Sequence, residues 1–411
     1  MSARGEASLE QPARWHARWR RRLGLERGAG ALAAGLFVYG FGEELWFRYL
    51  PALLRFLGAS AFMVGAFGTL KDLLDAAYAY PGGWLTDRLG SRRALLLFGA
   101  LTTAGFLVYL AFPSIPLLFA GLFLVMAWQS LGLPATFTLL REEMTGGGRL
   151  VGFTVQSVIK RLPIVLAPPI GGYLIGRFGM MAGMRYGFAL SIVLSILMLL
   201  GLRRAFRRHD APAGPELGPH GRVRLQPALV RLLIADCLIR LCEGLPEVFL
   251  VVWALEIAHL SAARFGILTA ILMITAIVSY APAAFLAGRA EKKPFVVLTY
   301  LFFTLFPLGV VFAHSFAALA GAYVLGGLRE IGEPARKALI LDLTVSDPGR
   351  TVGLYYSIRG FAVAGAAALG GALWTIRPEL TFYAAAALGA LGTLWAALML
   401  PSQPPMHKET S

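Results

Sequence analysis

Between two apolar stretches the chain reads Gly83-Trp84-Leu85-Thr86-Asp87-Arg88-Leu89-Gly90-Ser91-Arg92-Arg93. Its glycines allow close helix packing and a sharp turn. Asp87 can stabilise a helix N-terminus, and Arg88, Arg92 and Arg93 can pair with acids or lipid phosphates. The alternative role of these arginines is to fix membrane topology. The segment predicts a short polar loop between two membrane-spanning helices.

The composition is that of a membrane protein. Of 411 residues, 57% are apolar and 15% are charged, and the mean hydropathy is +0.66. Soluble domains carry roughly a quarter charged residues, and one water-soluble core cannot bury this much apolar surface. The two cysteines, Cys237 and Cys242, share one apolar stretch and the six histidines are scattered. We therefore expect no disulfide framework, no metal site and no cofactor.

Twelve apolar segments are each long enough to span a bilayer. Basic residues outside them concentrate on the side that holds both termini. The positive-inside rule thus predicts a multi-pass protein of the cell (inner) membrane with both termini cytoplasmic. The arginine- and tryptophan-rich N-terminal tail is expected to contact membrane lipids, and nucleic acid is not an expected partner. The segments are 29–54, 60–82, 94–112, 116–139, 151–175, 186–202, 227–255, 265–287, 294–313, 316–345, 352–375 and 380–400.

The sequence repeats itself after about 200 residues. Gly42-Glu43 matches Cys242-Glu243, and Leu131-Gly132-Leu133-Pro134-Ala135 matches Ile331-Gly332-Glu333-Pro334-Ala335. This repeat predicts an all-α membrane protein of two parallel six-helix bundles with a central cavity between them. The predicted domains are a basic tail (1–28), a first bundle (29–202), a cytoplasmic linker (203–226), a second bundle (227–400) and a C-terminal tail (401–411).

The opening segment resembles the G-x-L-x-D-R-x-G-x-R-R motif of the major facilitator superfamily. A degenerate second copy of the motif begins at Ala284 and has Gly288 at the position of Asp87. The resemblance implies a twelve-helix secondary transporter that moves a small solute by alternating access. It also implies that Asp87 latches the outward-facing state near the start of segment eleven. The motif residues of this expected latch are Gly83, Asp87, Arg88, Gly90, Arg92 and Arg93.

Two further stretches bear on coupling and direction. Ala167-Pro168-Pro169-Ile170-Gly171-Gly172 resembles the G-P-x-x-G-G part of the antiporter motif, with alanine for the first glycine, which favours export. A helix bend and close packing at Pro168, Gly171 and Gly172 explain the stretch equally well. In segment four, Trp128 replaces the arginine of the R-x-x-Q-G motif found in proton-coupled members. Proton coupling through that residue is therefore not expected.

Placing a charged side chain inside the membrane costs free energy, so such residues are by default interpreted as functional. Segments 3, 6, 8, 9 and 12 contain none in their interiors, and the family places 3, 6, 9 and 12 toward lipid, so the charged helices are expected to line the cavity. The predicted coupling or substrate-cavity residues are Glu43, Glu44, Lys71, Asp72, Asp75, Lys160, Arg161, Arg240, Glu243, Glu247, Arg329, Glu333, Arg336 and Arg359.

Spacing suggests how these charges are arranged. Lys71 and Asp75 lie four residues apart on one helix face, and Glu43 and Glu243 are expected to face each other across the pseudo-axis. These two glutamates are also the leading candidates for carrying a proton. The alternative is a static set of salt bridges. Three charges near helix ends, Arg48, Arg231 and Asp342, are expected to be structural in this sense.

We therefore predict a monomeric transporter of a small molecule, leaning to proton-coupled efflux of a drug or metabolite. A solute uptake symporter or uniporter of the same fold is the main alternative. A membrane-embedded enzyme is a remote one, because the sequence holds no G-x-S-x-G or H-E-x-x-H motif.

Overall fold

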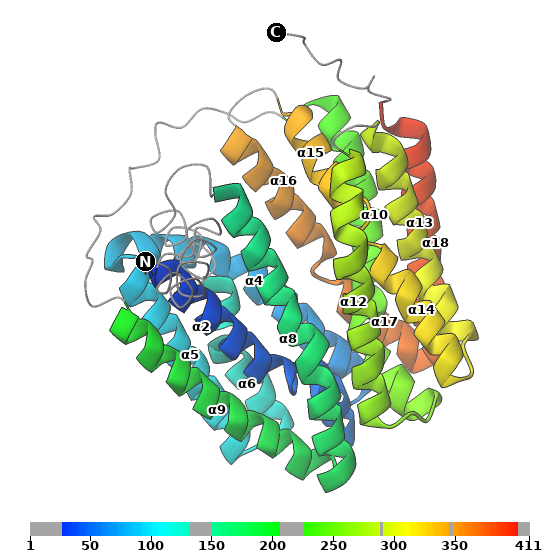
Figure 1. Cartoon of the computed structure of the whole chain (residues 1–411). Helices are drawn as coiled ribbons and strands as arrows, with labels where there is room; N and C mark the ends of the chain where they lie inside the picture. The colour runs from blue at the N-terminus through cyan, green and yellow to red at the C-terminus, as the bar shows by residue number, and fades with distance from the viewer. Residues whose placement is uncertain (1–26, 132–148, 206–224, 288–290, 345–347, 402–411) are drawn as a thin grey trace, which may run out of the picture.

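The computed structural model describes residues 27–131, 149–205, 225–287, 291–344 and 348–401 (Figure 1). Within these ranges the chain is helical and contains no strand. The first half comprises α2 (Arg27–Glu44), η1 (Phe47–Tyr49), α3 (Leu50–Phe56), α4 (Ala61–Leu89), α5 (Ser91–Ala111), α6 (Ile115–Met126), η2 (Ala127–Leu131), α8 (Arg149–Phe178) and α9 (Met180–Ala205).

The second half repeats this order of elements. It comprises α10 (Pro227–Glu247), α11 (Phe249–Val252), η4 (Trp253–Ile257), α12 (Ala262–Ala287), α13 (Lys292–Phe312), α14 (Phe316–Leu328), α15 (Glu333–Asp342), α16 (Pro348–Val363), α17 (Ala366–Ile376) and α18 (Pro378–Met399). The twelve spans are, in order, α2–α3, α4, α5, α6–η2, α8, α9, α10–η4, α12, α13, α14–α15, α16–α17 and α18.

Hydropathy alone identifies only some of these spans. Within the described residues, six stretches are long and apolar enough to cross a membrane by length and composition: Ser91–Ala111, Met180–Arg204, Ala262–Tyr280, Lys292–Phe312, Thr351–Ile376 and Pro378–Met399. Five of them are the segments that carry no internal charge in the sequence. The remaining spans are broken into shorter helices or carry charged side chains, which lowers their hydropathy.

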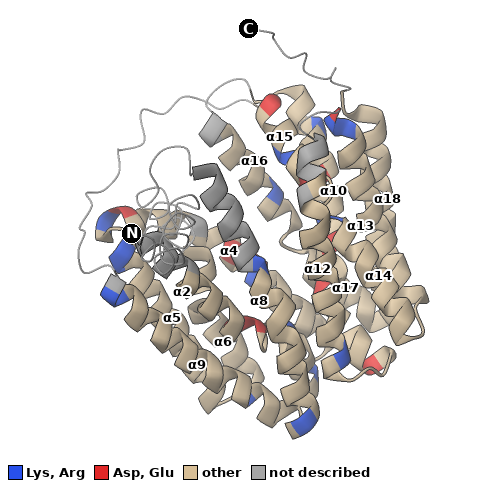
Figure 2. Cartoon of the chain, viewed as in Figure 1, with Lys and Arg blue, Asp and Glu red and all other residues tan. Residues whose placement is uncertain are grey.

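Four of the uncharged spans, α5, α9, α13 and α18, lie on the outside of the molecule, whereas α12 lines the cavity. Figure 1 shows α5 and α9 on the flank of one half and α13 and α18 on the flank of the other. In Figure 2 the middle lengths of these helices carry no blue or red colour, because they contain no charged residue. On α18, Leu391, Leu394 and Leu398 are all more than half exposed. Exposed leucines on an uncharged helix suit a surface in contact with lipid tails, as predicted for spans 3, 6, 9 and 12.

The two halves pack tightly at one end through glycine. A Cβ added at Gly172 would lie 2.2 Å from the Ala262 carbonyl oxygen, and one at Gly65 would lie 2.3 Å from that of Ala367. Only glycine permits this approach of α8 to α12 and of α4 to α17. Figure 1 shows α8 and α12 side by side at this end and diverging toward the end where both termini lie.

Two polar contacts close the same end. Arg55 of α3 pairs with Glu256 of η4 through two N–O distances of 3.0 and 3.1 Å. The Tyr49 hydroxyl lies 2.6 Å from the Pro168 carbonyl oxygen and 3.1 Å from that of Ala262. Since α12 belongs to the second half, Tyr49 connects both halves at the tight end.

The segment that opened the sequence analysis is less of a loop than expected. Its residues up to Leu89 form the last turns of α4, and α5 begins at Ser91. Gly90 alone turns the chain, with φ of +79°, a conformation that favours glycine. The polar connection is therefore a single residue, and Asp87 and Arg88 lie on the helix end rather than in a loop.

Candidate functional site

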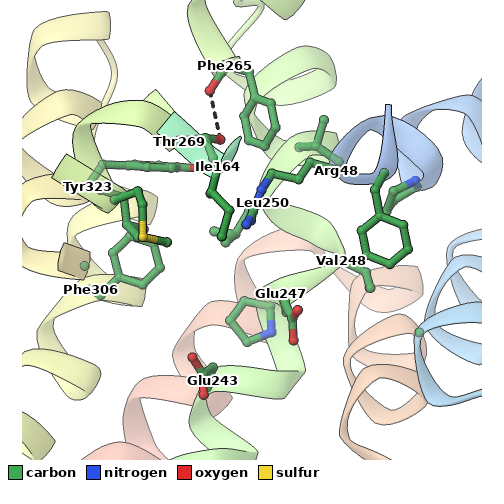
Figure 3. Close-up of a pocket in the computed structure, with 18 of the residues that line it drawn as sticks. Arg48, Ile164, Glu243, Glu247, Val248, Leu250, Phe265, Thr269, Phe306 and Tyr323 are labelled. Carbon is green, nitrogen blue, oxygen red and sulfur yellow. Dashed lines mark hydrogen bonds between the residues drawn. The ribbon is translucent and has the colours of Figure 1, made fainter. Parts of the chain in front are cut away.

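A cavity of about 370 Å³ lies between the two halves (Figure 3). Residues of both halves line it, from the break between α2 and α3, from α4 and η2, and from α10 to α14. Its volume falls at the lower end of the range of small-molecule sites. The polar or charged lining residues are Glu44, Arg48, Lys71, Gln129, Glu243, Glu247, Thr269, Tyr323, Arg329 and Glu330.

Only some of the predicted cavity residues line this space. Five do: Glu44, Lys71, Glu243, Glu247 and Arg329. Eight others are not among the lining residues: Glu43, Asp72, Asp75, Arg161, Arg240, Glu333, Arg336 and Arg359. The side chain of Lys160 lies outside the described residues.

In the first half, Glu43 and Asp75 are held by neutral partners on η2. Glu43 is 3% exposed and accepts a hydrogen bond of 2.5 Å from the Gln129 side-chain amide. Its second oxygen, Oε1, is buried and has no hydrogen-bond partner among the described residues. Asp75 accepts a hydrogen bond of 2.7 Å from the Ser130 hydroxyl. η2 is a π-helical turn, a feature that often marks functional sites.

Two expectations from helical spacing are wrong. Lys71 pairs with Asp72 at 3.3 Å and with Glu247 of the other half at 3.1 Å, not with Asp75. Glu43 and Glu243 do not face each other, since Glu43 is buried inside the first half while Glu243 lines the cavity. Spacing along one helix does not account for partners on neighbouring helices, which decide both cases.

The second half holds its acids with arginine. Asp236, 1% exposed, accepts hydrogen bonds from the Tyr300 and Tyr355 hydroxyls at 3.0 and 2.8 Å. It also pairs with Arg336 at 2.5 Å and with Arg359 at 3.3 Å. A buried charge with this many donors is well compensated. The cluster joins α10, α13, α15 and α16 into one unit.

The charge network continues from this cluster to the cavity. Arg336 also pairs with Glu333 at 2.7 Å, and Glu333 lies 3.8 Å from Arg240. Arg240 pairs with Glu243 at 2.5 Å, and Glu243 lies 3.5 Å from Arg329. The charged residues of α10 thus pair with residues on several other elements as well as with each other.

Two ion pairs next to the cavity connect the halves. Lys71 of α4 pairs with Glu247 of α10, and Arg161 of α8 pairs with Glu330 at 2.8 Å. The Arg161 guanidinium also lies 5.3 Å from the centre of the Tyr280 ring on α12. Any movement of one half against the other must break or rearrange these contacts.

The predicted latch residues lie at the end of α4 and the start of α5, and none of them lines the cavity. Asp87 is exposed and makes no hydrogen bond or ion pair with another described residue. Arg88 stacks on Trp84, 4.6 Å from its ring centre, and Arg93 is exposed. The latch therefore stays a prediction.

The proline–glycine stretch acts as a packing surface. α8 runs without interruption through Pro163, Pro168 and Pro169. A Cβ on Gly171 would lie 1.7 Å from the Leu45 carbonyl oxygen, so this glycine is needed for close approach. A bend at Pro168 with a role in export stays a prediction.

Sequence reasoning missed five polar or charged cavity residues: Arg48, Gln129, Thr269, Tyr323 and Glu330. Arg48 was expected to be structural, yet it extends into the cavity from the break between α2 and α3 (Figure 3). Its position four residues after Glu44 was the available signal, and the two pair at 2.7 Å. Gln129 and Tyr323 are uncharged and gave no signal inside apolar segments.

A twelve-helix protein in two parallel halves, with a charged cavity between them, has the architecture of a membrane transporter. The sequence model of the Major Facilitator Superfamily matches residues 32–242 and again 232–411, so the chain belongs to this superfamily. It is a multi-pass membrane transporter of this family, and family and fold indicate a transporter rather than an enzyme.

Two relatives and one solved structure illustrate the similarity. An uncharacterized MFS-type transporter of Methanocaldococcus jannaschii is 22% identical over 87% of this chain and 91% of its own length. Sugar efflux transporter A of Escherichia coli is 28% identical over 69% of this chain and 73% of its own. A crystal structure of the peptide transporter POT superposes with a TM-score of 0.74 at 17% identity, covering 91% of this chain and 93% of that one.

Proposed function

We propose that this protein exports a small solute from the cytoplasm in exchange for protons, with Glu43 as the proton-carrying residue. The observation that carries the proposal is the pairing of a fully buried carboxylate with a neutral amide that itself lines the cavity. Glu43 lies behind Gln129, and Gln129 forms part of the cavity wall. Occupation of the cavity can therefore act on Glu43 through one hydrogen bond.

The surroundings of Glu43 suit a group that gains and loses a proton. A carboxylate buried without a cation is costly to keep charged. Among the described residues, the only hydrogen-bond partner of its side chain is Gln129, and Oε1 has none. Glu243 is less suitable because Arg240 and Arg329 hold its charge. Asp75, held by Ser130, is the second candidate.

Export is favoured over uptake by two resemblances. The stretch around Pro168 and Gly171 is similar to part of the antiporter motif, and one relative is an efflux transporter. Under the proposed topology, with the termini in the cytoplasm, the end held together by Arg55, Glu256 and Tyr49 is the outer face, and we take this state to be the inward-facing one. In this state the proposed latch at Asp87 is released, in keeping with its lack of a described partner.

The test is transport into inside-out membrane vesicles from cells expressing the protein. A panel of radiolabelled solutes is screened, and the first solute accumulated with an imposed acidic interior becomes the probe. Accumulation here reports export, whereas accumulation only in right-side-out vesicles would show uptake and overturn the direction.

The residue assignment is tested with Glu43→Gln. We expect this variant to lose accumulation driven by the pH gradient while keeping solute exchange without a gradient, because exchange needs no net proton movement. Glu379→Gln, at the start of α18 and outside the cavity, is the matched control and should keep both activities. Gradient-driven accumulation by Glu43→Gln at the level of the unmodified protein would defeat the assignment.

A further inference from the structure

We infer that the cavity selects neutral, hydroxyl-rich solutes, such as sugars or glycosides carrying a small apolar group, over charged ones. The inference rests on the part of the proposed function that makes the cavity the substrate site. It does not depend on the direction of transport or on proton coupling. It comes from the charge pairs of the wall, from the neutral groups between them and from the aromatic surfaces.

Every charged residue of the described cavity wall already has a counter-charge. Arg48 pairs with Glu44 at 2.7 Å, and Lys71 pairs with Glu247 at 3.1 Å. The wall thus presents many donors and acceptors but no free charge of either sign. The other two pairs are Arg329–Glu243 at 3.5 Å and Arg161–Glu330 at 2.8 Å.

This pairing penalises a charged solute. A carboxylate or ammonium group must open one of these pairs, and the displaced partner is then left without compensation in a partly buried site. A hydroxyl group both donates and accepts. It can therefore bind beside an intact pair, accepting from the cation and donating to the carboxylate. The wall thus favours hydroxyl groups over ions.

Neutral side chains add hydrogen-bonding groups of the same kind. The Tyr323 hydroxyl makes no hydrogen bond to another described residue and can both donate and accept. Thr269 donates to the Phe265 carbonyl oxygen at 3.2 Å, which leaves its oxygen able to accept. Gln129 uses one amide hydrogen for Glu43. Figure 3 shows Tyr323 and Thr269 on the same side of the cavity as Arg48.

Aromatic rings supply the apolar part of the site. Phe47, Phe67 and Phe265 line the cavity. Two more rings, those of Phe303 and Phe306, lie 4.7 and 4.9 Å from the Arg329 guanidinium and hold it in place. Rings of this kind pack against the C–H faces of a sugar or against a small apolar group. The cavity volume of about 370 Å³ suits a solute of one or two rings.

The test compares three probes that share a phenyl pyranoside core and differ in the charge of one substituent, at C6 in the glucuronide and at C2 in the glucosaminide. They are phenyl β-glucoside (neutral), phenyl β-glucuronide (a carboxylate) and phenyl β-glucosaminide (an ammonium). Binding is measured by thermal stabilisation of the protein in lipid nanodiscs without a pH gradient, because glycosidic detergents would compete. We expect the glucoside to bind about tenfold or more tightly than either charged probe. A charged probe that binds equally or better, or no stabilisation by the glucoside up to its solubility limit, overturns the inference.

A pair of variants tests whether ion pairing sets the preference. Glu44→Gln leaves Arg48 without its partner, and Arg48→Gln leaves Glu44 without its partner. We expect Glu44→Gln to improve glucuronide binding and Arg48→Gln to improve glucosaminide binding, each by about tenfold. Both positions are partly exposed, with side chains 14% and 35% accessible, so both variants should fold.

The variant experiment has a control and an outcome that would contradict the inference. Glu379→Gln should keep the original order of the three probes, and unliganded melting temperatures report the folding of all variants. If neither cavity variant gains affinity for its matched ion, charge pairing does not set the selectivity and the inference fails. If the unmodified protein binds the glucoside but shows no proton-driven transport, that result counts only against the proposed coupling.

Discussion

The two halves of the molecule carry a glutamate at the same repeat position but hold it with different kinds of partner. Glu43 and Glu243 are separated by 200 residues, as are their partners Gln129 and Arg329. In the first half an amide holds the carboxylate at 2.5 Å, whereas in the second a guanidinium lies 3.5 Å from it. The repeat has kept the contact between spans while the charge of the partner differs.

A second position strengthens this contrast. Arg240, which pairs with Glu243 at 2.5 Å, has Gly40 as its repeat equivalent. The first-half carboxylate therefore lacks both arginines of its counterpart. A permanently paired acid keeps its charge, while an acid held only by an amide can become neutral. The comparison supports the proposal that the proton-carrying residue lies in the first half, where no arginine holds the carboxylate, and not in the second half, where the paired acid stays charged.

The Asp236 cluster makes the second half the more tightly connected one. Its repeat equivalent is Leu36, an apolar residue that is 7% exposed. Where the first half packs a leucine, the second joins four helices around one carboxylate. This difference suggests that the second half moves as a rigid unit.

The largest effect, a loss of stability of the folded protein, is expected from Asp236→Asn. The change removes one of the two counter-charges of Arg336, which is 2% exposed and keeps only Glu333, and it loosens Arg359. Removing one partner of a buried pair typically costs about 3–5 kcal/mol. We expect a large drop in melting temperature and in yield, measured in nanodiscs. Asp72→Asn, a carboxylate whose side chain is 30% accessible, is the control and should lower stability much less. Equal stability of the two variants would show that the cluster does not hold the second half together.

The next largest effect is expected from Gln129→Arg, which gives the first half the partner of the second. A guanidinium 2.5–3.5 Å from Glu43 should fix its charge. We expect gradient-driven accumulation in inside-out vesicles to fall at least about tenfold, while solute binding persists. Gln129→Asn, which keeps an amide, is the control. Full gradient-driven transport by Gln129→Arg would contradict the view that the amide is what allows Glu43 to act.

Much of the fold was predictable from the sequence because it depends on apolar length and on the repeat. The twelve spans and their two parallel groups follow from these patterns. The ends were less predictable, because α4 continues through Asp87 and Arg88 to Leu89. Charged residues at a helix end resemble a loop in sequence, since both face water.

The site was only partly predictable, for a physical reason. Spacing along one helix finds neighbours such as Glu44 and Arg48, but Lys71 reaches Glu247 across the interface between halves. Arg48 lies where span one breaks between α2 and α3, and no sequence pattern marks that break. Gln129 is part of the site because it donates a hydrogen bond to Glu43 and also lines the cavity. An uncharged residue in an apolar segment gives no sign of such contacts in the sequence.

The smallest effect is expected at Asp87, where the halves also differ, since the second copy of the motif has Gly288. A carboxylate at a helix N-terminus is worth about 0.3–1 kcal/mol at an exposed position. If Asp87 latches the outward-facing state, Asp87→Asn should raise the inward-facing population up to about fivefold. Spin labels at Phe56→Cys and Ile257→Cys, exposed positions at the closed end of the two halves, would report it as a larger short-distance population. Asp87→Glu keeps the charge and should leave the distribution unchanged. An identical distribution in Asp87→Asn would mean that the motif serves topology alone, so that the two halves differ in sequence there without differing in function.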